Sequence, residues 1–113
     1  MDCLFCNIVK GRIPSEIVYD DPHILAFKDI NPIAPTHVLV IPKIHIDRIT
    51  SLKPEHQEIM GHLMCSIPRI VKDLGLTGRG VRIVNNCEAE AGQSVFHVHF
   101  HILGGRSFAW PPG

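Results

Sequence analysis

His-Val-His-Phe-His-Ile-Leu at residues 97–103 alternates imidazole and apolar side chains. Alternation with period two predicts a β-strand that is buried on one face. Successive side chains leave opposite faces of a strand, so Val98, Phe100 and Ile102 are expected to enter the core while the three histidines share the other face. Neighbouring histidines would lie about 6.5 Å apart. Imidazole serves as a nucleophile, a general acid or base, or a metal ligand, so this face is the candidate functional site.

The composition is that of one ordinary globular domain. The 113 residues suffice for a single core, and 45% of them are hydrophobic. Eleven basic and eleven acidic side chains cancel, so charge gives no reason to expect binding to nucleic acid or to an anionic membrane. No internal repeat, low-complexity segment or linker divides the chain. The sequence therefore predicts one domain over residues 1–113.

The N-terminal segment bears on location and on cysteine chemistry. No apolar run approaches the roughly 20 residues that cross a bilayer, and residues 1–6 lack the basic and apolar regions of a signal peptide. We therefore expect a cytoplasmic protein whose four cysteines are thiols or metal ligands rather than disulfides. Cys3 and Cys6 form a Cys-x-x-Cys pair that suits a redox pair, half of a zinc site, or two small buried side chains.

Periodicity places the other elements. Residues 17–19 and 23–27 form two β-rich runs around a turn at residues 20–22, which predicts a hairpin. Residues 37–42 are the most hydrophobic run and predict a buried central strand that ends at Pro42. The apolar stripe within residues 54–74 predicts the main helix, and residues 82–86 predict a further strand.

Polar residues in the loops add candidates to the histidine face. Asp29 leaves a strand end, where its carboxylate is placed to bind a ribose diol or to shape the loop as an Asx-turn. His37, at the start of the central strand, could face the same cavity as the three histidines. The loop before them brings neutral donors from Asn86, Gly92, Gln93 and Ser94, and its backbone N–H groups could form an anion nest.

Two chemistries suit three histidines on one strand face, and local spacing does not choose between them. Two of the imidazoles could share a zinc ion with another ligand or a water. Alternatively, a neutral imidazole could attack phosphorus while neighbouring donors hold the phosphate oxygens. The neutral donors of the preceding loop favour an anionic phosphate.

Residues 92–106 closely resemble the signature of the histidine-triad (HIT) nucleotide-binding proteins, and the likeness extends over nearly the whole chain. It includes residues 27–30, 34–37, 41–43 and 61–63. The tail Trp-Pro-Pro-Gly at residues 110–113 resembles the purine nucleoside phosphoramidase branch rather than the dinucleoside polyphosphate hydrolases.

This resemblance implies both a fold and an activity. The fold would be α+β, with an antiparallel sheet of about five strands, one long helix and a short N-terminal helix, and two copies would dimerise into a larger continuous sheet. The activity would be hydrolysis of the P–N bond of AMP- or GMP-like phosphoramidates through a nucleotidyl-histidine intermediate. The alternatives are a dinucleoside polyphosphate hydrolase, a nucleotidyl transferase, and a regulatory scaffold that binds nucleotide or zinc.

The resemblance also implies a role for each site residue. His99 would be the nucleophile, His101 would contact the phosphate, Ser94 would lie near the leaving amine, and His97 and His37 would complete the catalytic group. Trp110 would reach the active site of the partner copy. The implied nucleotide-binding residues are Phe27, Asp29, Ile30, Asn86, Gly92, Gln93, Ser94, Val95, His99, His101 and Trp110.

Some proteins of this family carry the N-terminal cysteine pair and others lack it. Where the pair is present, the resemblance implies a zinc site completed by two histidines, which here would comprise Cys3, Cys6, His45 and His97. Such a Cys₂His₂ set would be closed and structural, with no role in the chemistry. It would leave His99 and His101 free to react.

Overall fold

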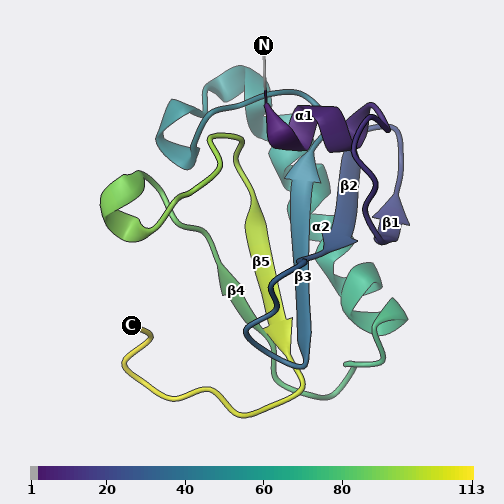
Figure 1. The fold of residues 1–113 in the computed structure, drawn as a ribbon, viewed down its shortest axis with the longest axis vertical. Helices are drawn as coiled ribbons and strands as arrows, with labels where there is room; N and C mark the ends of the chain where they lie inside the picture. The colour runs from purple at the N-terminus through teal and green to yellow at the C-terminus, as the bar shows by residue number, and fades with distance from the viewer. Residues whose placement is uncertain (1–2) are drawn as a thin grey trace.

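The five strands form one antiparallel sheet in the order β1-β2-β3-β5-β4 (Figure 1). The computed structural model describes residues 3–113. The strands are β1 (Ile17–Asp20), β2 (Ile24–Lys28), β3 (Thr36–Pro42), β4 (Arg82–Val84) and β5 (Phe100–Gly104). Hydrophobic residues 37–42 do form the central strand, and the predicted hairpin is the β1–β2 pair.

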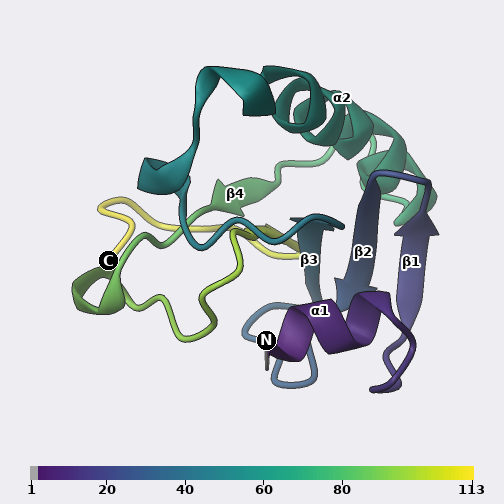
Figure 2. The same cartoon turned by 90° about the horizontal axis from the view of Figure 1, so that it is seen from above.

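The two α-helices cover opposite faces of this sheet. Helix α1 (Leu4–Val9) lies on one face and helix α2 (Gln57–Asp73) on the other (Figure 2). The alternation of β3 separates the two cores: Val38 and Val40 pack on the α2 side, whereas Leu39 and Ile41 pack on the α1 side with Phe5. The expected α+β fold is therefore confirmed.

Helix α2 is close to the predicted element but starts later. Leu63 and Ile70 are fully buried on its apolar stripe, as the periodicity predicts. The first predicted turn, Pro54–His56, is a 3₁₀ turn rather than α-helix. Gly75, at φ +75°, follows the C-terminal end, where a left-handed residue commonly terminates a helix. No helix within residues 3–113 is both long and apolar enough to span a membrane.

Strand β5 is shorter than the alternation predicts, because it begins at Phe100 and not at His97. Its last ladder pair with β3 joins Phe100 to Val40. Pro42 then ends β3, and the N–H of Val98 instead donates to the carbonyl of Ile46 at 2.6 Å. The predicted facing still holds, since Val98, Phe100 and Ile102 all lie in the α2-side core.

Asp21 ties the β1–β2 hairpin to helix α2. Its carboxylate accepts hydrogen bonds from the backbone N–H groups of His23 (2.8 Å) and Ile24 (2.9 Å), and from the Tyr19 hydroxyl (2.9 Å). A fourth bond comes from Nε2 of His62 on α2, at 2.7 Å. Burial raises the pKa of Asp21, but these donors outweigh it and hold the pKa well below its ordinary value.

Replacing Asp21 with alanine should destabilise the fold by about 2 kcal/mol at neutral pH, because several donors lose a charged acceptor. A lowered folded-state pKa gives stability that is present above the ordinary value of 3.8 and is lost as the pH falls through the folded value. The difference between wild type and Asp21→Ala should therefore shrink below about pH 4, as measured by urea unfolding.

Asp20→Ala is the matched control. Asp20 makes only a partly exposed ion pair with Lys43, so its loss should cost less than about 1 kcal/mol. Equal destabilisation by the two substitutions would contradict the role assigned to Asp21.

Candidate active site and metal-binding cluster

The three histidines gather on the α1 side of the sheet, as the alternation predicts. The ring centroids of His99 and His101 lie 5.1 Å apart, and those of His101 and His37 also lie 5.1 Å apart. Phe5 of α1 meets the rings of both His97 and His99 edge-on, at 5.9 and 5.1 Å between centroids. The predicted cavity face is therefore a cluster of imidazoles held between β3, β5 and α1.

His99 has the geometry of a nucleophile. Its Nδ1 lies 2.8 Å from the backbone carbonyl of His97, and because a carbonyl only accepts, Nδ1 must carry the proton. Nε2 is then left with a lone pair and has no hydrogen-bond partner within residues 3–113. Burial lowers the pKa of His99, which favours the neutral ring that can attack an electrophile.

His37 and His101 form a directed chain of hydrogen bonds. The N–H of Ile33 donates to Nδ1 of His37 at 3.2 Å, so the proton of that ring is on Nε2. Nε2 of His37 in turn donates to Nδ1 of His101 at 2.8 Å. The proton of His101 is therefore on its own Nε2.

The Nε2–H of His101 is buried and has no partner within the part of the chain that the structure describes. Buried donors are almost always paired, so an unpaired one indicates a group that a ligand satisfies. An anionic oxygen would suit this donor, as the neutral donors of the neighbouring loop also suggest. The histidine cluster therefore combines one imidazole lone pair with one imidazole donor.

Asp29 closes this cluster and also shapes its loop. One carboxylate oxygen accepts the N–H of Asn31 at 2.8 Å, which is the Asx-turn alternative considered from the sequence. The other oxygen lies 3.4 Å from Nε2 of His37. The ligand atoms of Asp29, His37 and His101 lie within 4.8 Å of one another. Hydrogen bonds already occupy both nitrogens of His37, so this set is a hydrogen-bond relay, in which each ring fixes the proton of the next, rather than a preformed metal site.

The other predicted nucleotide-binding residues differ in how they are placed. Phe27 is buried with its ring 5.5 Å from that of Phe5, whereas Ile30 is 88% exposed and Trp110 is 81% exposed. The amide of Asn86 lies beside Gly92, whose φ is +96°.

Gln93 is buried and its side-chain amide is fully used by the protein. It donates to the carbonyls of Asp47 and Val95, and it accepts the N–H of Glu88. The next residues, Ser94 and Val95, line a hollow of about 510 Å³ together with Cys3, Leu4, His45, Asp47 and Phe96. Gln93 therefore shapes the loop, while Ser94 is exposed in the hollow and Val95 both lines the hollow and packs against the α1-side core.

Cys3, Cys6, His45 and His97 do come together, and their ligand atoms all lie within 4.8 Å of one another. Nδ1 of His97 is 3.5 Å from Sγ of Cys3 and 3.6 Å from Sγ of Cys6, and Nδ1 of His45 is 3.4 Å from Sγ of Cys6. Zinc bonds of about 2.3 Å to sulfur and 2.0 Å to nitrogen, set tetrahedrally, require an S–N distance of about 3.5 Å. The cluster therefore has the dimensions of a tetrahedral metal site.

The protons of the two histidines in this cluster are directed away from its centre. Nε2 of His97 donates to the Pro42 carbonyl at 2.8 Å, and Nε2 of His45 donates to the Asp47 carboxylate at 2.7 Å. Both Nδ1 atoms therefore point lone pairs at the cysteines, and Asp47 is the kind of outer partner that orients metal-binding histidines. Helix α1 places the two thiols one turn apart, with Cys3 as its N-cap.

Two further residues have structural roles at the site that the sequence analysis does not predict. Asp47 orients His45, and the side chain of Asn85 donates to the carbonyl of His99 at 2.9 Å. Both are loop residues: Asp47 lies two positions after His45, whereas Asn85 bonds a carbonyl fourteen residues further along the chain. Asn85 could have been flagged as a polar residue at a strand end, but nothing in its neighbourhood distinguishes it from Asn86.

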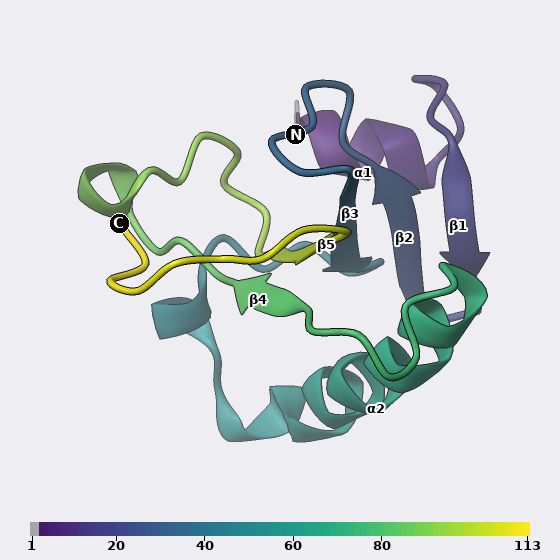
Figure 3. The ribbon, with the colours of Figure 1, turned by 90° about the horizontal axis from the view of Figure 1, so that it is seen from below.

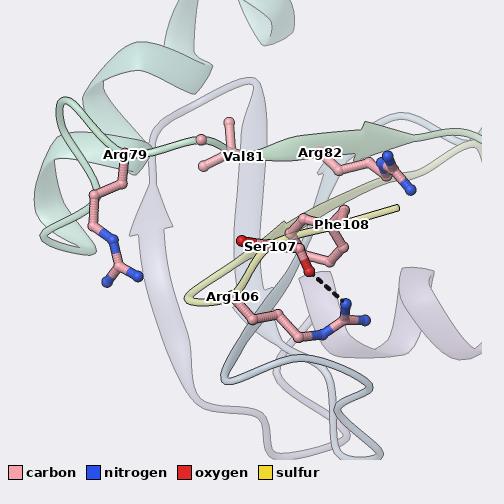
Figure 4. A pocket seen from close by; sticks show the side chains of 7 residues that line it. Arg79, Val81, Arg82, Arg106, Ser107 and Phe108 are labelled. Atoms are coloured by element: carbon pink, nitrogen blue, oxygen red, sulfur yellow. Dashed lines mark hydrogen bonds between the residues drawn. The ribbon is translucent and has the colours of Figure 1, made fainter. Parts of the chain in front are cut away.

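The C-terminal segment runs past β4 (Figure 3). Residues of both line another hollow, of about 590 Å³ (Figure 4). The guanidinium groups of Arg82 and Arg106 lie over the ring of Phe108, at 5.2 and 4.3 Å from its centroid. Arg106 also donates to the carbonyl of Ile33 at 3.3 Å, and Ile33 is the residue whose N–H holds His37. None of the predicted site residues lines this hollow, but Arg106 bonds to the loop at Ile33, which also donates to His37.

The sheet, the long helix and the three alternating histidines define the histidine-triad class of α+β proteins. The HIT domain family matches residues 10–108, and the chain belongs to the HIT family. It is 47% identical to the 14 kDa zinc-binding protein of Zea mays, covering 97% of this chain and 87% of that protein.

Solved structures agree with this assignment. A HIT family hydrolase from Legionella pneumophila superposes with a TM-score of 0.96 at 44% identity, covering 99% of this chain and 100% of that one. A histidine triad nucleotide-binding protein from Candida albicans superposes with a TM-score of 0.84 at 31% identity, covering 97% and 83%. The fold and the family rest on nearly the full length of the chain.

The environment of His101 predicts its protonation. Burial, followed by the nearby His99 and His37 rings, lowers the pKa of His101 from 6.5 to about 4. His101 should therefore remain neutral at a pH where a free imidazole is half protonated, and its ¹⁵N shifts should show the Nε2–H tautomer. The lowered pKa also means that the unfolded chain takes up this proton first, so His101 reduces the stability of the fold as the pH falls below 6.5.

The control is the same histidine in the chain unfolded in urea, which should titrate at the ordinary value. A native midpoint at or above 6.5 would contradict the buried relay.

Proposed function

We propose that the protein is a purine nucleotide-binding hydrolase that cleaves the P–N bond of nucleoside 5'-phosphoramidates through a nucleotidyl-histidine intermediate. The observation that carries this proposal is where the ring protons of two neighbouring triad histidines lie. His99 offers a lone pair on Nε2, and His101 offers a buried N–H with no partner within residues 3–113. A nucleophile beside an anion donor suits attack on phosphorus.

The proposed reaction has two displacement steps. Nε2 of His99 attacks phosphorus, the P–N bond of the substrate breaks, and the amine leaves with a proton taken from solvent beside Ser94. Water then attacks the nucleotidyl-imidazole and gives up one proton to solvent, which balances the proton taken up in the first step; the nucleoside monophosphate is released and neutral His99 is restored. The His97 carbonyl stabilises the positive charge on the His99 ring in the intermediate, because it accepts the Nδ1–H throughout.

The proposed phosphate contacts come from His101 and the preceding loop. His101 would donate its Nε2–H to a phosphate oxygen, and His37 would keep that proton on Nε2 by donating to Nδ1. Ser94, Val95, Gly92 and Asn86 would complete the phosphate site. Gln93 would act through the loop conformation, because its own amide is occupied.

The nucleoside would lie against the loop at residues 29–36. Asp29 would hold the ribose, Phe27 and Ile30 would line the purine pocket, and Trp110 of a partner copy would close it. The exposure of Ile30 and Trp110 supports this, because both present apolar surface that a base or a second subunit would cover. We propose a homodimer that extends the sheet at β4, which is an edge strand.

We also propose that Cys3, Cys6, His45 and His97 hold one structural zinc ion per chain. The donor set, the S–N distances and the orientation of both histidines fit that ion, and a relative from Zea mays is named a zinc-binding protein. With no ligand position left open, the ion would cross-link α1 to the segment that precedes β5. It would take no part in the reaction.

Replacing His99 with asparagine should lower kcat/KM for an AMP–amine conjugate by at least about 1,000-fold, because the nucleophile is lost. Binding of AMP should persist, since the other phosphate contacts remain. Wild type should also yield a labelled nucleotidyl adduct at His99, mapped after acid-free quenching by mass spectrometry. Faster turnover of a dinucleoside polyphosphate than of the AMP–amine conjugate would instead favour a dinucleoside polyphosphate hydrolase.

His23→Asn is the matched control. His23 is exposed and packs on His62 beside the β1–β2 turn, so this variant should keep wild-type turnover. Undiminished turnover by the His99→Asn protein would remove His99 from its role.

Protein purified without chelator should contain about one zinc ion per chain. Cys6→Ser should lower the content to less than half, because it removes one of four ligands, and should also lower Tm. Cys65→Ser should leave metal content and Tm unchanged, because Cys65 lies exposed on α2. Fewer than about one ion per two wild-type chains, measured by elemental analysis, would count against the site.

A further inference from the structure

Glu88 has a backbone conformation that glycine normally takes. Its φ is +75° and its ψ is 159°, a backbone region that residues other than glycine almost never adopt. Every other residue with positive φ in residues 3–113 is a glycine. Such a conformation persists only where the surroundings impose it, and it often accompanies a functional site.

Contacts to both the backbone and the side chain of Glu88 impose it here. Its N–H donates to the Gln93 side chain at 2.8 Å, and its carbonyl accepts the N–H groups of Ala91 and Gln93, each at 3.1 Å. Its carboxylate pairs with Arg48, whose guanidinium group lies 4.9 Å above the ring of Phe96. The backbone of Glu88 is therefore held by its own loop, and its carboxylate is held by the segment that follows β3.

That same segment holds the loop at a second point. The carbonyl of Asp47, the neighbour of Arg48, accepts the Gln93 side-chain N–H at 2.9 Å. A third contact joins Thr50 to Cys87, with 3.5 Å between Oγ1 and Sγ. The loop that these three contacts hold leads directly into Ser94 and Val95, which line the hollow of about 510 Å³.

We propose that the positive φ of residue 88, which the contacts with Arg48 and Gln93 impose on Glu88, sets the loop at residues 92–95 for catalysis, with no contact between Glu88 and the substrate. The proposal rests on the proposed function, because it assigns that loop to the phosphate. It predicts an effect on kcat more than on KM, since a displaced loop would still admit the nucleotide but would misplace the groups around the reacting phosphorus.

Two substitutions at this position separate conformation from charge. Glu88→Ala removes the carboxylate but keeps a Cβ that opposes the positive φ, so the loop should relax away from its native conformation. Glu88→Gly also removes the carboxylate but accepts the positive φ freely, so the loop should stay in place. Arg48→Ala leaves the Cβ of residue 88 and removes the ion pair, so it should resemble Glu88→Ala.

The first measurement is turnover of an AMP–amine conjugate. Glu88→Ala and Arg48→Ala should lower kcat by about tenfold with little change in KM, whereas Glu88→Gly should stay within about twofold of wild type. Arg69→Ala is the control, because it breaks an exposed ion pair with Asp73 on α2, away from the loop.

The second measurement is amide exchange at Ala91, Gly92 and Gln93, whose N–H groups all bond within this loop. Exchange should speed up in Glu88→Ala and Arg48→Ala and remain at the wild-type rate in Glu88→Gly. This readout needs no substrate, so it tests the positioning role even if wild type fails to cleave a P–N bond. Unchanged exchange in Glu88→Ala, or equal acceleration in Glu88→Ala and Glu88→Gly, would overturn the proposal.

Discussion

The site depends on the hydrogen bonds that the ring and the backbone carbonyl of His97 make. The β3–β5 ladder ends at the Val40–Phe100 pair, so the carbonyl of Pro42 needs another donor, and Nε2–H of His97 supplies it. Nδ1 of the same ring is thereby left as a lone pair facing two cysteines, and the backbone carbonyl of His97 holds the proton of His99. One fully buried histidine thus pairs the Pro42 carbonyl where the ladder ends, directs a lone pair at the two cysteines, and fixes the tautomer of the candidate nucleophile through its backbone carbonyl.

Burial makes this arrangement chemically useful, because a charged imidazole could neither attack phosphorus nor ligate a metal. Burial lowers the pKa of His37, His99 and His101, and His101 reaches about 4. The same burial would be costly if the ring N–H groups lacked acceptors. They have them at His37, His97 and His99, and the exception, Nε2 of His101, is the atom at which a ligand oxygen would be satisfied.

The sequence predicted the parts of this site that depend on local periodicity. Alternation placed Val98, Phe100 and Ile102 in the core and the histidines opposite them, and it does so even though the first three residues of that stretch are not paired in the ladder. It could not show where pairing stops, because Pro42 of the partner strand decides that. Nor could it find the roles of Asn85, the strained Glu88 or the Asp47 carbonyl, which arise only when segments distant in sequence meet.

Helix α1 makes the two halves of the site one structure. It carries Cys6 of the candidate metal-binding cluster and has Cys3 as its N-cap, and between the two lies Phe5, whose ring packs edge-on against His99 as well as His97. Whatever fixes the cysteines to His45 and His97 therefore also fixes Phe5, which forms one wall around the candidate nucleophile. Asp47 adds a second link, because its carboxylate orients His45 while its carbonyl holds Gln93 in the loop before the triad. Under the proposed function, a zinc ion in this cluster would stay outside the reaction and would still affect how firmly His99 and the loop before the triad are held.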